Sequence, residues 1–160
     1  MSTATVAIAL FTRDLRVHDN PVLHAACRAA AQVVPLFVLD TAILRGGSMS
    51  ANRAVFLAEA LADLDAHLRE RHGYLVLRCG SVVQQVERIV ADLQVTEVHL
   101  AADVSGYSHR REQALRARLA AQGCQLRVQV SRRGELRPPA LVEPCVTLSR
   151  HTAPVAQPMG

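Results

Sequence analysis

The feature that most constrains this chain is the regular alternation of short apolar runs with longer segments of helical periodicity. Strand-like apolar runs lie at 6–11, 33–39, 74–78, 97–101 and 126–130. Helix-like segments lie between them at 21–31, 51–72, 82–93 and 106–122. Strands joined by single helices run parallel, with right-handed crossovers. The pattern therefore predicts an α/β fold: a doubly wound, Rossmann-like five-stranded parallel sheet with helices on both faces.

The predicted helices begin and end at residues that suit those positions. Asn20 is a good N-cap, and Pro21 fits the first helical position, where its missing N–H costs nothing. Ser50 is placed to cap the long helix, and Ser81 is placed to cap the helix after it. Gly73 is expected to end the long helix.

The 160 residues are enough for one domain with a substantial core. We assign this domain to residues 1–130. Residues 131–160 hold five of the seven prolines and show no sustained period, which predicts an irregular tail. The net charge of +4 is not concentrated in a dense basic patch, so direct DNA binding is not expected.

Cysteine usage and hydropathy indicate a cytoplasmic chain. The four cysteines form no C-x-x-C pair and are expected to be buried thiols rather than a disulfide frame or a zinc site. No apolar stretch reaches the roughly 20 residues of a membrane helix, so no membrane association is expected. The first ten residues have no basic region, so a secretory signal is not expected.

In a doubly wound sheet, ligands bind at the carboxyl ends of the strands near the topological switch point. Two of the predicted strands end at such places with an aspartate, Asp40 and Asp103. Their carboxylates could accept hydrogen bonds from a ring N–H or a hydroxyl of a bound heterocycle. Capping of a helix or loop is an equally good interpretation.

Arginines near the predicted sheet edge are the other candidates for ligand binding. Arg13, Asp14 and Arg16 form either an anion site or a self-neutralising ion-pair network, and mixed charge favours the network. Arg53 lies in a first helical turn, where the helix dipole disfavours a cation, so a ligand or carboxylate partner is favoured. The sequence shows no nucleophile paired with a base, no glycine-rich phosphate loop and no spacing typical of metal ligands. We therefore predict no catalytic residue and no metal site.

Four segments together resemble one known family. Residues 11–21 read FTRDLRVHDNP, which strongly resembles the opening motif of the DNA photolyase/cryptochrome family. Residues 36–40, 52–57 and 102–112 resemble the family's second strand, long helix and segment after strand four, in the same order. The resemblance covers residues 5 to about 130. It implies the family's N-terminal α/β domain, which holds an auxiliary light-harvesting (antenna) chromophore.

The resemblance also implies what this chain does not do alone. In the family, the catalytic FAD, a tryptophan electron-transfer chain and the DNA-binding cleft lie in a later helical domain. FAD and DNA repair are therefore not expected of this chain by itself, and whether it counts as an enzyme stays open. The chain is interpreted as a truncated product, a remnant or a free-standing module, with a separate helical FAD domain as a possible partner.

The chromophore class follows from matched positions. Tyr107-Ser108 stands where folate-binding members have Asn-Glu, which disfavours folate. In members that bind 8-hydroxy-5-deazaflavin, the ring lies against the ends of strands two and four. The resemblance therefore favours 8-hydroxy-5-deazaflavin or FMN, with these cofactor-binding positions: Val38, Leu39, Asp40, Arg53, Asp103 and Arg111.

Two alternatives to a free-standing antenna domain remain open at this point. The chain could be a functional photolyase component that needs a separate FAD-binding domain. It could also be a generic nucleotide-binding or flavin-binding α/β module. A glycine-rich phosphate loop after the first strand would favour the generic module, and residues 12–20 contain no glycine.

Overall fold

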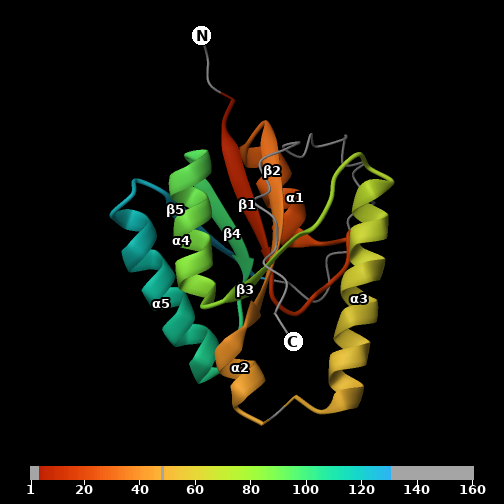
Figure 1. Ribbon diagram of the computed structural model, residues 1–160. Helices are drawn as coiled ribbons and strands as arrows, with labels where there is room; N and C mark the ends of the chain where they lie inside the picture. Colours follow the sequence, from red (N-terminus) through yellow and green to blue (C-terminus); the bar gives the residue numbers. More distant parts are fainter. Residues whose placement is uncertain (1–3, 48, 131–160) are drawn as a thin grey trace.

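The computed structural model of the chain describes residues 4–47 and 49–130 (Figure 1). These residues form ten elements, in which strands alternate with helices except that α2 and α3 are consecutive. They are β1 (Val6–Phe11), α1 (Pro21–Ala29), β2 (Gln32–Asp40), α2 (Thr41–Arg45), α3 (Ala51–Arg69), β3 (Val76–Gly80), α4 (Val82–Leu93), β4 (Glu97–Ala101), α5 (Gly106–Ala120) and β5 (Gln125–Gln129).

The five strands form one parallel sheet in the order β3-β2-β1-β4-β5. The apolar strand β1 is central and completely buried, as its uninterrupted VAIALF run predicts for a strand covered on both faces. The chain moves from β1 to one edge through β2 and β3, then returns to the other side of β1 with β4. This reversal places the topological switch point between β1 and β4. The predicted doubly wound sheet is confirmed.

Helices cover both faces of the sheet. One core layer lies between the sheet and the helices α4 and α5, and its fully buried members include Ile8, Leu36 and Leu115. The second layer lies on the opposite face, where α1 and the second half of α3 pack against Ala7, Phe11 and their neighbours. In Figure 1, α4 and α5 lie together on one side of the sheet, and α3 runs along the other.

The predicted N-caps are confirmed. The Asn20 side chain accepts hydrogen bonds from the amides of Val22 and Leu23 at 3.0 and 3.1 Å. Ser50 caps α3 and Ser81 caps α4, each through its hydroxyl oxygen. These contacts satisfy amides that the first helical turn leaves without partners.

The region between α3 and β3 differs from the sequence-based expectation. The helix ends at Arg69 rather than at position 72, and β3 begins at Val76 rather than at 74. Beyond Arg69 the chain turns at His72, which has a left-handed φ of 63°, and the amide of Gly73 donates to the carbonyl of Leu68 at 2.9 Å. The amide N–H of Leu75 donates to the carboxylate of Asp65 at 2.8 Å and therefore does not join the sheet.

The short helix α2 was not predicted. Asp40 ends β2 and at once caps α2, because its side chain accepts the amide N–H of Ala42 at 2.9 Å. The sequence left ligand binding and helix capping open for Asp40, and the structure shows that its side chain caps α2. Helix α2 also places apolar side chains at the carboxyl edge of the sheet.

The expectation of buried cysteines is wrong for Cys79, which lies exposed on the edge strand β3. Cys124 is buried, and burial raises the pKa of its thiol to about 11. Cys145 and the predicted tail, residues 131–160, lie outside the described residues. Among the described residues, no helix is long and apolar enough to cross a membrane.

His99 on β4 is a buried polar side chain beside Glu97 and Arg127. Burial lowers the pKa of His99 and outweighs the opposing effect of Glu97. Below the ordinary histidine pKa of about 6.5, the unfolded chain thus takes up a proton that the folded chain does not.

We therefore expect the free energy of unfolding to fall as the pH drops from about 6.5, by at most about 1.4 kcal/mol per pH unit from this group. His99→Gln should flatten the profile in this window. Urea unfolding at a series of pH values measures the effect. A slope between pH 6.5 and 5 that is the same in both proteins would contradict it.

Candidate functional site

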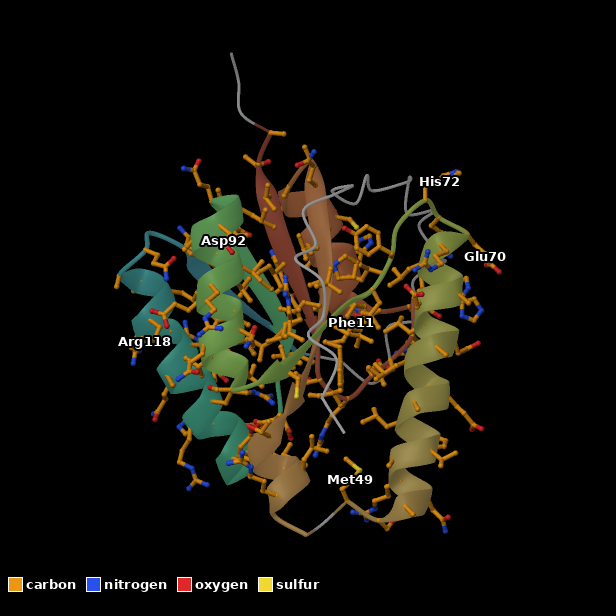
Figure 2. All side chains as sticks on the ribbon, in the orientation of Figure 1. Phe11, Met49, Glu70, His72, Asp92 and Arg118 are labelled. Atoms are coloured by element: carbon orange, nitrogen blue, oxygen red, sulfur yellow. The ribbon has the colours of Figure 1, made fainter. Side chains whose placement is uncertain are left out.

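A pocket opens at the carboxyl edge of the sheet, where β1 and β2 end. Its floor consists of the last residues of these strands, and its walls come from the surrounding helices. Met49, labelled in Figure 2, lies between α2 and the start of α3. The lining comprises Leu10, Phe11, Thr12, Phe37, Val38, Leu39, Asp40, Ile43, Leu44, Met49, Leu57, Val82 and Arg111.

Helix α3 contributes Leu57 to the lining of the pocket. The second half of this helix packs on the sheet through Leu61, Leu64 and Leu68, whereas Val55 and Phe56 in the first half are exposed. Leu57, four residues before Leu61 and thus on the same face, lines the pocket.

Arg111 is the only cation among the residues that line the pocket. It lies on the inward face of α5, which also carries the buried Ser108 and Leu115, and its guanidinium stands 5.6 Å from the centre of the Tyr107 ring. Burial lowers the pKa of Arg111, opposed by the charges of Asp103 and Asp40. The arginine nevertheless stays charged at any ordinary pH.

The Nε atom of Arg111 is buried and has no hydrogen-bond partner among the described residues. A buried N–H donor without a partner costs about 1–3 kcal/mol. An acceptor on a bound ligand would remove this cost. The pocket thus combines apolar walls with one unsatisfied, charged donor.

Asp103 lies at the switch point but is not among the lining residues. Its carboxylate forms an ion pair with Arg13 at 3.1 Å, which joins the ends of β4 and β1. It also accepts the amide N–H of Ser105, so it caps the loop before α5. The Ser108 hydroxyl, hydrogen-bonded to Asp103, lowers the pKa of this carboxyl.

The charged run after β1, residues 13–16, is only partly a self-neutralising network. Arg16 pairs with Asp14 at 2.9 Å, as the structural interpretation of this run predicts. Arg13 instead pairs with Asp103, a residue from the far side of the switch point. Arg16 also donates to the backbone carbonyl of Asp19, a residue with positive φ, and so holds the turn before α1.

The six residues predicted to bind the chromophore are not all in one place. Val38, Leu39, Asp40 and Arg111 line the pocket. Arg53 lies exposed in the first turn of α3, one turn before Leu57, and does not line it. Arg110 is exposed, whereas Arg111 shares the inward face of α5 with Leu115 and is half-buried.

Most apolar lining residues were not predicted. Ile43 and Leu44 come from α2, Met49 from the loop after it, and Val82 from the first turn of α4. Their place in the pocket depends on how the connections fold over the sheet edge. Among the described residues, no group of His, Cys, Asp and Glu could hold a metal ion.

Residues 7–142, which make up most of the chain, match the DNA photolyase family. The chain belongs to the DNA photolyase family. It is 51% identical over 124 residues to a deoxyribodipyrimidine photo-lyase of Streptomyces griseus, covering 78% of this chain and 27% of that protein. It is 38% identical over 137 residues to a (6-4) DNA photolyase of rice, covering 76% of this chain and 25% of that protein.

A solved structure agrees with these relatives. An archaeal photolyase of Sulfolobus tokodaii, described with two FAD molecules and a novel light-harvesting cofactor, has a TM-score of 0.73 and 26% identity. The match covers 79% of this chain and 29% of that one. This photolyase-family chain thus spans about a quarter of the length of its relatives and corresponds to their N-terminal α/β domain. The resemblance seen in the sequence is confirmed.

Proposed function

We propose that this chain is a light-harvesting-chromophore-binding domain that holds a flavin or a deazaflavin in the pocket at the carboxyl edge of the sheet. The observation that carries the proposal is Arg111, whose unpartnered Nε lies in an apolar pocket of a photolyase-family domain. The archaeal relative with a second FAD supports a flavin-type antenna molecule.

The pocket fits such a ring system in its chemistry. Ligand pockets are mostly apolar, with a few polar groups that fix the orientation of the ligand. Val38, Leu39 and Leu44 would contact the faces and edge of the ring, and Arg111 would donate to a carbonyl or ionised hydroxyl oxygen. When bound, the chromophore would absorb light and pass on the excitation energy.

Asp40 and Arg53 have secondary roles in this proposal. Asp40 lines the pocket while capping α2, so its second oxygen could accept a hydrogen bond from a ring N–H or hydroxyl. Arg53 lies in the first turn of α3, one turn before the lining residue Leu57, and would pair with the phosphate of FMN. 8-Hydroxy-5-deazaflavin and FMN are the favoured ligands, and folate is disfavoured because Ser108 is already bound to Asp103.

DNA repair would require a companion domain. We propose that a helical FAD-binding domain, on a separate chain or elsewhere in the protein, receives the excitation energy and performs the chemistry. In this proposal, the chain itself contributes only the antenna role to the repair activity of its relatives.

Titration of the purified chain with FMN and with 8-hydroxy-5-deazaflavin tests the proposal. We expect saturable one-to-one binding, seen as a shift in absorbance and a change in ligand fluorescence, and weaker binding of a reduced folate. Leu44→Trp should block the pocket and abolish binding. Leu77→Trp is the matched control, because Leu77 is 41% exposed, close to the 42% of Leu44, and does not line the pocket. No binding of either ligand would contradict the proposal.

A further inference from the structure

Three of the described residues that line the pocket have polar side chains, and the other lining residues are apolar. Arg111 offers only hydrogen-bond donors, and its buried Nε has no partner within the described part of the chain. Thr12 offers a hydroxyl, which can donate or accept, and an ionised Asp40 offers only acceptors. These three side chains therefore decide which polar groups a ring buried in this pocket can carry.

The topology brings the three side chains to one end of the sheet. Thr12 directly follows β1, and Asp40 ends the neighbouring strand β2. Asp40 lies two residues after Val38, so the two share a face of β2, and Val38 belongs to the core layer that α4 and α5 cover. Arg111 comes from the inward face of α5. The acceptor thus comes from the sheet and a donor comes from the helix that covers it.

The capping role of Asp40 uses only one of its two oxygens. Its Oδ1 accepts the amide N–H of Ala42 at 2.9 Å and holds the start of α2. The other helices in the described ranges are capped by side chains that carry no charge, namely Asn20, Ser50, Ser81 and Ser105. A helix cap does not need the second carboxylate oxygen, which leaves Oδ2 as an acceptor for a ligand in the pocket.

We propose that Thr12, Asp40 and Arg111 recognise a cyclic imide, that is, a ring N–H flanked by two carbonyl groups. Oδ2 of Asp40 accepts the imide N–H, and Thr12 and Arg111 each donate to one carbonyl oxygen. The imide presents one donor and two acceptors, which complement the one acceptor and two donors of the pocket. This inference rests on the proposed function and deepens it, because FMN and 8-hydroxy-5-deazaflavin share an imide on their pyrimidine ring.

The first test compares FMN with 3-methyl-FMN, in which a methyl group replaces the imide hydrogen. The wild type should bind 3-methyl-FMN at least about tenfold more weakly than FMN, the effect of losing one hydrogen bond to a charged group. Fluorescence titration gives both dissociation constants.

Asp40→Asn shows whether this difference comes from Asp40. The amide oxygen of asparagine keeps the cap of α2, while its NH₂ group replaces the acceptor Oδ2. The ratio of the two dissociation constants should therefore fall at least about threefold, because only FMN loses a hydrogen bond. A purely structural role of Asp40 weakens both ligands equally, so an unchanged ratio would overturn the proposal.

The second test assigns the two donors to the two carbonyl groups. Infrared spectra of bound FMN, labelled with carbon-13 at one imide carbonyl at a time, give the stretching frequency of each. Thr12→Val should raise one frequency and Arg111→Met the other, because a carbonyl that loses a hydrogen bond vibrates at higher frequency. Thr41→Val is the matched control, since Thr41 lies in α2 beside Asp40 and does not line the pocket. Unchanged frequencies in Thr12→Val, or the same carbonyl shifted by both variants, would contradict imide recognition.

Failure of the proposed function and failure of this inference give different results. If the wild type binds neither FMN nor 8-hydroxy-5-deazaflavin, the proposed function is wrong, and imide recognition is wrong with it. If FMN binds and Leu44→Trp abolishes that binding, the pocket is the binding site. Equal affinities of the wild type for FMN and 3-methyl-FMN would then show that only imide recognition is wrong.

Discussion

Replacing Arg111 with methionine is expected to weaken binding of FMN or 8-hydroxy-5-deazaflavin about ten- to a hundredfold. A hydrogen bond to a charged group contributes about 1.5–3 kcal/mol, and 1.4 kcal/mol corresponds to a factor of ten. Methionine keeps an unbranched chain against Tyr107 while removing the charge and the Nε–H donor. Fluorescence titration gives the dissociation constant directly.

The same substitution should not destabilise the free protein much. Arg111 is partly desolvated and its Nε has no partner within residues 4–47 and 49–130, so the folded chain gains little from the charge. Arg110→Met is the matched control, because Arg110 is the neighbouring residue and is exposed. Its dissociation constant should match that of the wild type. Equal affinity of Arg111→Met and wild type would show that the ligand does not use this cation.

Replacing Leu115 with alanine is expected to lower the free energy of unfolding by about 2–5 kcal/mol. Leu115 is fully buried on the inward face of α5, within the core layer below the pocket. The lost methyl groups and the resulting cavity account for this cost, which is a large part of the 5–15 kcal/mol of a typical domain. The expected result is a lower urea midpoint with an unchanged slope.

Leu77→Ala is the control for this measurement, because Leu77 lies on the edge strand β3 and is 41% exposed. It should cost less than about 1 kcal/mol. A small effect at Leu115 would mean that α5 is held to the sheet by contacts other than this core. The position of Arg111 would then depend on the loop before α5 rather than on packing.

The strands and the helix starts could be predicted because local physics determines them. The VAIALF run of β1 has no other stable place than the centre of a sheet. Asn20 before Pro21 specifies a helix start with both its side chain and its fixed φ. In such segments, the local preference and the final fold agree.

The remaining features depend on contacts between distant residues. The start of β3 shifts because Asp65 captures the amide of Leu75, ten residues away. Arg13 pairs with Asp103 rather than with its neighbour Asp14 because β1 and β4 lie side by side. No local pattern contains these pairings.

The pocket itself was predicted only in part for the same reason. Asp40 and Arg111 were identified through the family resemblance, whereas Leu44 and Met49 come from a short helix and loop whose path is set by packing. One local signal for Arg111 does exist in the sequence. Its spacing of four from Leu115 places it on the inward face of α5, unlike Arg110.

A crystal structure of this chain with bound FMN or 8-hydroxy-5-deazaflavin tests the central claim most directly. We expect the ring system between α2, the first turns of α3 and the carboxyl ends of β1 and β2. A ligand oxygen should lie within hydrogen-bond distance of Arg111 Nε. A ring bound anywhere else, or bound in this pocket without a contact to Arg111, would contradict the account.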